Sequence, residues 1–86
     1  MRSLVISPYT SRIGREWVIA TARSMDRPEE ITSINYYLLS DRGIGAFCRD
    51  YARMESPPAP DAIAFREIGE STKATILERL KAYIRR

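Results

Sequence analysis

Histidine is absent from this 86-residue chain, and Cys48 is its only cysteine. Histidine is the commonest metal ligand and general base in proteins, and structural metal sites combine several cysteines and histidines. The sequence therefore predicts no metal site, no bound cofactor and no catalytic residue. A single cysteine also cannot form an internal disulfide, which is typical of proteins from a reducing compartment.

Long apolar runs are also missing. The first residues contain three consecutive strongly apolar side chains, at positions 4–6, which is too short for the core of a signal peptide. A membrane-spanning helix needs about 20 apolar residues, and no run approaches that length. We therefore expect a cytoplasmic protein that makes no membrane contact.

Lysine is scarce as well, and the glycine pattern of a phosphate-binding loop is missing. Lys73 and Lys81 are the only lysines among the 14 basic residues, and the formal net charge is +3. Arginine suits carboxylates, phosphates and aromatic rings, so this charge permits nucleic-acid binding without requiring it. Gly43 and Gly45 lack the third glycine and the lysine of a phosphate-binding loop. Together with the missing histidine, this predicts that the protein is not an enzyme.

The composition is that of a globular protein, with 44% hydrophobic and 29% charged residues. The length predicts one small domain over residues 1–86, near the lower limit for folding without disulfides or metal. Three prolines within residues 55–60 predict a linker between the N-terminal part and a C-terminal strand and helix. A chain this short gains stability from burying a shared face, so a homodimer is one expectation.

The N-terminal third allows two interpretations. Residues 4–6 and 17–22 are rich in β-forming side chains and predict two paired strands. Pro8 is also a plausible helix start, and Tyr9, Ile13 and Trp17 would then share one helical face. The sequence leaves residues 8–25 open between these alternatives.

Residues 26–38 carry competing signals too. Asp26, Pro28 and Glu29 have the spacing of a helix N-terminus with a capping box, and apolar residues follow at helical intervals. The alternative is a strand, because the segment from Ile31 to Tyr37 is rich in β-formers. The capping signal favours the helix, but the sequence leaves residues 31–40 open between helix and strand.

Further along, the periodicity is clearer. Residues 42–55 predict a helix, because their apolar side chains share one face: Ile44, Phe47, Cys48, Tyr51 and Met54. Residues 62–68 predict a strand, and Ser71 or Thr72 can cap a final helix. The sum is an α+β fold: a small antiparallel sheet of about three strands, packed by two or three amphipathic helices, in the order ββααβα.

Five residues form the predicted partner-binding set. Arg42, Arg49 and Arg53 lie opposite the apolar face of their helix and form a basic strip, for which an ordinary solvated surface is the alternative. Tyr36 and Tyr37 are adjacent, so both cannot point inward, and the exposed one would be an interface anchor.

These features predict a binding protein that acts stoichiometrically, as a regulator, inhibitor or accessory subunit of a larger protein or nucleoprotein complex. Small cofactor-free chains of this kind are typical of phage and mobile-element products. One alternative is a DNA- or RNA-binding regulator, in which residues 27–54 form a helix-turn-helix-like pair and the arginine strip contacts phosphates. A second alternative is a small enzyme whose reactive groups converge only in the fold.

Overall fold

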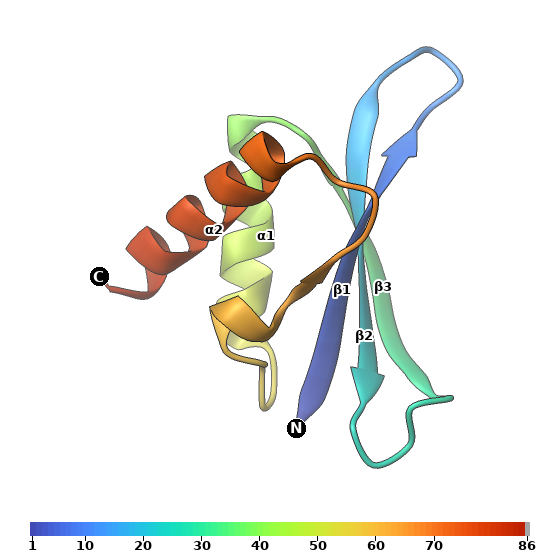
Figure 1. Cartoon of the computed structure of the whole chain (residues 1–86), viewed down its shortest axis with the longest axis vertical. Helices are drawn as coiled ribbons and strands as arrows, with labels where there is room; N and C mark the ends of the chain where they lie inside the picture. Colours follow the sequence, from blue (N-terminus) through green and yellow to red (C-terminus); the bar gives the residue numbers. More distant parts are fainter. Residues whose placement is uncertain (86) are drawn as a thin grey trace.

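A four-stranded sheet carries both α-helices on one of its faces (Figure 1). The structure is a computed structural model and describes residues 1–85. Its elements, in chain order, are β1 (Arg2–Thr10), β2 (Glu16–Ser24), β3 (Ile31–Leu38), α1 (Asp41–Arg53), a short 3-10 helix η1 (Pro60–Ala62), β4 (Ala64–Phe65) and α2 (Glu70–Ile84). The predicted α+β class is therefore confirmed, with a mixed sheet and the order βββαβα.

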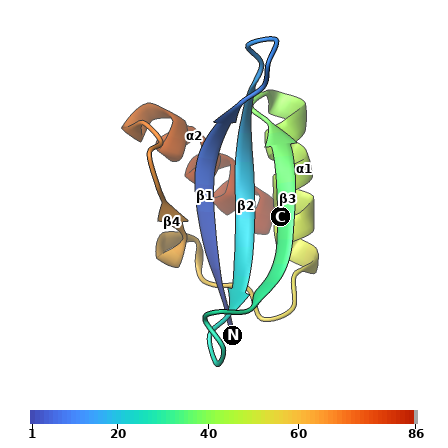
Figure 2. The same cartoon turned by 90° about the vertical axis from the view of Figure 1, so that its right-hand side faces the viewer.

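The sheet order is β3-β2-β1-β4. The first three strands form an antiparallel meander, in which Ile6 lies opposite Ala20 and Ala20 lies opposite Asn35. The short β4 then pairs in parallel with β1, so that Phe65 lies beside Ile6. Both helices cover one face, and Figure 2 shows the other face of β1, β2 and β3 with nothing in front of it.

The core lies between that covered face and the two helices. Alternation along β1 and β2 turns every second side chain toward the helices. The buried apolar side chains are Leu4, Ile6, Val18, Ala20, Ala22, Tyr37, Ile44, Phe47, Cys48, Tyr51, Ile63, Ile76 and Leu80. Ile6 from the sheet and Leu80 from α2 are among the most completely buried of these side chains.

The predicted helix over residues 42–55 is confirmed as α1, which spans Asp41–Arg53. Its N-cap is Ser40, whose hydroxyl oxygen accepts a 3.1 Å hydrogen bond from the backbone N–H of Gly43. Gly43 is also where the helix meets the end of β3. A Cβ at this position would lie 1.8 Å from the carbonyl oxygen of Leu38, so only glycine fits there.

The helix predicted over residues 26–38 is wrong, because residues 31–38 form β3. The segment that resembles a capping box is instead a tight connection between two strands. The N–H of Glu30 donates to the carbonyl of Arg27 at 2.8 Å, and the side chain of Arg23 donates to the carbonyl of Pro28 at 3.0 Å. Pairing with β2 overrides the local signal, and the helix-turn-helix-like pair predicted over residues 27–54 does not form.

The open question about residues 8–25 is answered in favour of strands. β1 continues through Pro8 to Thr10, and a hairpin turn leads into β2. In that turn Ser11 and Arg15 bond each other through their backbones at 2.8 Å, and Gly14 has a φ of +84°, where glycine is favoured.

The C-terminal elements differ from the expectation in their bounds. The strand predicted over residues 62–68 shrinks to the two residues of β4, preceded by η1. The final helix is confirmed, but its N-cap is Gly69 rather than Ser71 or Thr72. Within the proline-rich segment 55–60, Pro58 is buried and its carbonyl accepts a hydrogen bond from the Tyr51 hydroxyl, so this segment packs onto the core.

Candidate binding surfaces

The arginine strip lies on the solvent side of α1, as its spacing predicts. Arg42, Arg49 and Arg53 are all exposed, while the opposite side of the same helix packs into the core. Within residues 1–85, none of the three forms an ion pair with an acidic group. Their guanidinium groups are therefore free to meet carboxylates or phosphates on another molecule.

A fourth arginine, from α2, extends this strip. Arg79 donates to the carboxylate of Asp41 at 3.2 Å and to its backbone carbonyl at 3.1 Å, which ties α2 to the start of α1. The side chains of Arg79 and Arg49 both approach Gly45, where a Cβ would lie 3.6 Å and 3.8 Å from them. The absence of a side chain at Gly45 leaves room for both groups. Sequence reasoning missed Arg79, because no local pattern links residues so far apart in the chain.

The two adjacent tyrosines point in opposite directions, as predicted. Tyr37 is 7% exposed and faces the helices, whereas Tyr36 is 55% exposed and faces away from them. Tyr36 therefore lies on the side of the sheet opposite α1. The structure does not bring the five predicted partner-binding residues together, because the arginine strip and Tyr36 occupy opposite sides of the molecule.

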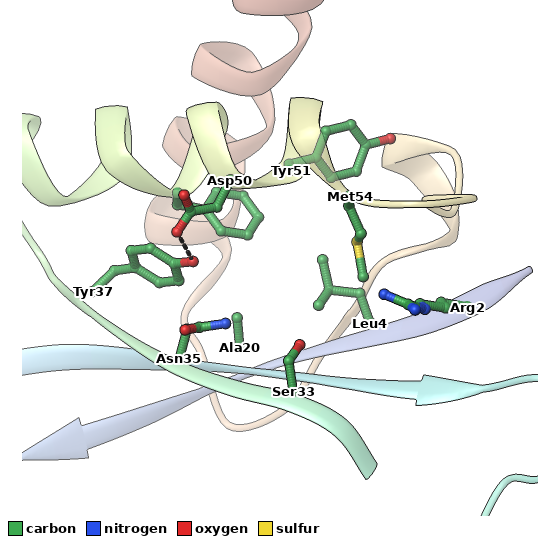
Figure 3. A pocket seen from close by; sticks show the side chains of 10 residues that line it. Arg2, Leu4, Ala20, Ser33, Asn35, Tyr37, Asp50, Tyr51 and Met54 are labelled. Atoms are coloured by element: carbon green, nitrogen blue, oxygen red, sulfur yellow. Dashed lines mark hydrogen bonds between the residues drawn. The ribbon is translucent and has the colours of Figure 1, made fainter. Parts of the chain in front are cut away.

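Tyr37 lies in a hollow of about 170 Å³ between the sheet and α1 (Figure 3). Its hydroxyl donates a 2.6 Å hydrogen bond to a carboxylate oxygen of Asp50. Burial, together with this hydrogen bond, raises the pKa of the Tyr37 phenol well above its usual value. A phenol held in its protonated form is a poor nucleophile, and its main effect is to connect β3 to α1.

Several exposed apolar side chains lie on the uncovered face of the sheet, which we call the open face. It has twelve side chains: Ser3, Val5, Ser7 and Tyr9 from β1; Trp17, Ile19, Thr21 and Arg23 from β2; and Ile31, Ile34, Tyr36 and Leu38 from β3. Tyr9 and Tyr36 meet edge to face, with ring centroids 5.6 Å apart. The aromatic end of the open face thus lies near the β1–β2 hairpin.

Charge on the open face is concentrated at one side. Arg23 and Arg66 line a shallow hollow together with Glu67, beside Val5 and Thr21. Trp17, Tyr9 and Tyr36 lie toward the other end, so the surface combines apolar side chains with arginine. Tryptophan, tyrosine and arginine are the residues that contribute most often to the energy of protein–protein interfaces.

The sequence contained a signal for the open face that the helical interpretation obscured. In β2, Trp17 and Ile19 alternate with Val18 and Ala20, so both sides of the strand are apolar. Two amphipathic helices suffice to cover only one side of a sheet this small. A strand that is apolar on both sides, in a chain with so few helices, indicates an uncovered face.

The residues that the structure describes give no support for a metal site or for a membrane-spanning helix. No three potential metal-ligating side chains within residues 1–85 come close enough to hold an ion. Neither helix has the length and apolar character required to cross a membrane. Comparison with protein-family models, with curated proteins and with solved structures finds no match to this chain.

Proposed function

We propose that the protein acts by stoichiometric binding to another protein, through the open face of its sheet, as a regulator, inhibitor or accessory subunit. The observation that carries this proposal is the uncovered apolar face itself. Four large side chains on it are more than two-fifths exposed: Tyr9, Ile31, Ile34 and Tyr36. Contiguous exposed apolar surface on a small protein is typical of a protein-interaction site.

The solvent-accessible surface area of the molecule supports the same proposal. The chain exposes 5924 Å² of solvent-accessible surface, whereas a folded monomer of this mass exposes about 5,200 Å². The excess, roughly 700 Å², approaches the ~800 Å² that each partner buries in an interface of standard size. A partner that covers the open face would bring the exposed area to the usual range.

The chemistry of the face defines the partner. Its apolar centre requires an apolar surface opposite. Arg23 and Arg66, which outnumber Glu67 in the hollow that the three share, favour acidic groups at one border of that surface. Aliphatic side chains outnumber aromatic ones on the face, which fits a folded protein better than stacked nucleic-acid bases. The partner is therefore a protein with an apolar patch bordered by carboxylates.

A test needs substitutions that alter the open face and preserve the fold. Tyr9 is exposed, and Thr21 lies near the centre of the face between Val5 and Ile34. The double variant Tyr9→Ala with Thr21→Glu removes an aromatic contact and adds a carboxylate that repels an acidic border. We expect it to weaken capture of the partner at least about tenfold, since aromatic anchors dominate such interfaces.

The matched control is Arg49→Ala with Arg53→Ala, which changes only exposed side chains on the other side of the molecule. Affinity capture from the source cells, with and without nuclease, is carried out with the wild type and both double variants. The proposal requires nuclease-resistant capture that the open-face variant loses and the control retains. Equal capture by the wild type and the open-face variant contradicts it.

The arginine strip supports a second candidate, a nucleic-acid-binding regulator. Arg42, Arg49 and Arg53 are exposed and form no ion pair within the described residues, 1–85, and Arg79 lies beside Arg49. Such a row suits backbone phosphates, and its affinity falls steeply as the salt concentration rises. In the capture experiment this candidate gives the opposite result: nuclease abolishes binding, and the arginine variant loses it.

That the protein is not an enzyme remains a prediction. The hollow beside Tyr37 and Asp50, of about 170 Å³, is smaller than the roughly 300 Å³ at which ligand pockets begin. The Tyr37 phenol is held protonated there, so it offers neither a nucleophile nor a base.

A further inference from the structure

From Ser33 to Leu38 the outer edge of β3 has none of the features that usually protect the edge of a sheet; the one irregularity in its pairing with β2 lies at the start of the strand, between the pairs Ala22–Ser33 and Arg23–Ile31. β3 lies at one end of the strand order and pairs only with β2. Its eight residues, ITSINYYL, contain no charged side chain, no proline and no glycine. Natural proteins block such edges with lysine, proline, bulges or very short strands, because exposed backbone groups pair readily with another strand.

The opposite edge of the sheet shows the contrast. β4 is only two residues long, and the charged residues Arg66 and Glu67 follow it directly. Glu67 has a φ of +59°, which turns the chain out of the extended conformation. The β4 edge is thus short, charged and bent, whereas the β3 edge is long, uncharged and extended.

The backbone groups that β3 turns outward follow from its pairing with β2. The N–H of Leu39 donates to the carbonyl of Glu16 at 2.9 Å, just beyond the last pair of the ladder. In an antiparallel pair, residues alternate between bonding inward and facing outward. From Ser33 to Tyr37, where the pairing is regular, odd-numbered residues therefore bond to β2, and the N–H and C=O groups of Ile34 and Tyr36 point away from the sheet.

We propose that a second copy of this chain pairs with β3 along this edge, antiparallel, about a two-fold axis at Asn35. In this register Ile34 lies opposite Tyr36 of the second copy and exchanges both backbone hydrogen bonds with it. The same pair recurs on the other side of the axis. Ile34 and Tyr36, the outward-facing positions on either side of Asn35 in the regular part of the strand, are then both paired.

The side chains agree with this pairing. An aromatic ring opposite a β-branched side chain is a favourable cross-strand pair, and Tyr36 and Ile34 form it twice across the axis. Asn35 lies opposite its own copy on the other side of the sheet, where two amides can bond each other. Because β3 contains no charged residue, the two paired strands bring no like charges of their own together.

The dimer is independent of the proposed function, because it uses the edge of the sheet and leaves the open face uncovered. A two-fold axis perpendicular to the sheet places both open faces on the same side, as one continuous surface twice as wide. α1 runs behind β3 (Figure 2), so the two arginine strips would also share the opposite side of the dimer.

Charge exchange at Asn35 tests both the dimer and its register. The residue is exposed, so Asn35→Lys and Asn35→Asp are compatible with the fold, which thermal unfolding of each variant verifies. In either variant alone, like charges face each other across the axis, and we expect the dimer dissociation constant to rise at least about tenfold. In an equimolar mixture opposite charges meet, so heterodimers form. Asn35→Ser, which adds no charge, is the matched control and retains the dimer.

Analytical ultracentrifugation over a range of concentrations gives the readout. A wild type that stays monomeric at every soluble concentration overturns the proposal. The same holds if the β3 edge binds an extended segment of a different protein and the chain itself remains monomeric. Variants that dimerise as well as the wild type, or a mixture that stays monomeric, also overturn it. Tyr9→Ala with Thr21→Glu leaves the dimer intact, which separates this test from that of the proposed function.

Amide hydrogen exchange provides a second readout. The amides of Ile34 and Tyr36 face outward, and we expect their exchange to slow as the protein concentration rises. The amide of Tyr37, bonded to β2, is protected at every concentration. Fast exchange at Ile34 and Tyr36 under dimer-forming conditions places the contact elsewhere and contradicts the proposal.

Discussion

The phenol of Tyr37 donates a 2.6 Å hydrogen bond to the carboxylate of Asp50, and this bond joins the edge strand β3 to α1. Beneath it, the Tyr37 ring packs edge to face on Phe47, with centroids 5.5 Å apart. The next residue, Tyr36, points to the opposite side of the sheet. One tyrosine thus holds α1 on the covered face, and its neighbour belongs to the open face.

Removing the Tyr37 hydroxyl should measure the strength of this link. We expect Tyr37→Phe to lower the free energy of unfolding by about 1 kcal/mol, the usual net value of a hydrogen bond. Asp50 is exposed, so water can solvate its carboxylate once the phenol is gone. Urea unfolding gives the value. Tyr36→Phe is the control and should change stability by less than about 0.5 kcal/mol; equal losses in the two variants would count against the link.

Alkaline pH should weaken the folded state through the same group. Burial and the bond to Asp50 raise the pKa of Tyr37 above its ordinary value of 10.0, and burial raises that of Tyr51. The stability that these two protonated phenols contribute is fully present at pH values below the pKa of tyrosine in the unfolded chain. As the pH rises past it, the unfolded chain loses protons that the folded chain keeps, so the free energy of unfolding falls. Thermal unfolding from about pH 9 to about pH 11 should show this decline, and Tyr37→Phe should make it shallower. An unchanged slope in the variant would contradict the assignment.

Two glycines of α1 should respond oppositely to alanine. Gly43→Ala places a Cβ 1.8 Å from the Leu38 carbonyl oxygen, and we expect a loss of at least about 2 kcal/mol from the forced separation of β3 and α1. Gly45→Ala meets nothing closer than 3.6 Å and should be neutral or stabilise by up to about 1 kcal/mol, because alanine favours the helix. Chemical denaturation of both variants measures the difference. A Gly43→Ala protein as stable as the wild type would show that the close approach is absent.

The inner face of α2 offers a third measure of stability. Leu80 is 0% exposed and Ile84 is 48% exposed, although both belong to the apolar stripe of the helix. Leu80→Ala should cost about 2 to 5 kcal/mol through the cavity it leaves, enough to unfold much of a domain this small. Ile84→Ala should cost less than about 1 kcal/mol. Circular dichroism during thermal unfolding compares them, and similar losses would indicate that α2 packs differently.

The helices of this fold were predictable because their signals are local. The spacing of Ile44, Phe47 and Tyr51 defines the buried side of α1, and Ile76 and Leu80 do the same for α2. The exposure of the arginine strip follows from the same periodicity.

The signals that failed depend on contacts between distant parts of the chain. Asp26 and Glu29 have capping-box spacing, yet the residues after them bond to β2 across a turn that no local pattern specifies. Gly43 is required by the carbonyl of Leu38, and Arg79 joins the strip only because α2 packs beside α1. Local propensity is a weak guide where long-range strand pairing decides the structure.

Trp17 allows the most direct test of the open face, because it is the only tryptophan in the chain and lies on that face. Fluorine NMR of protein labelled with fluorotryptophan then gives a single signal, which can be followed as the captured partner protein is added. We predict that this signal shifts and becomes shielded from solvent in the complex, while substitution of Arg49 and Arg53 leaves the change intact. A complex that forms with the Trp17 signal unmoved and still exposed to solvent would contradict the account.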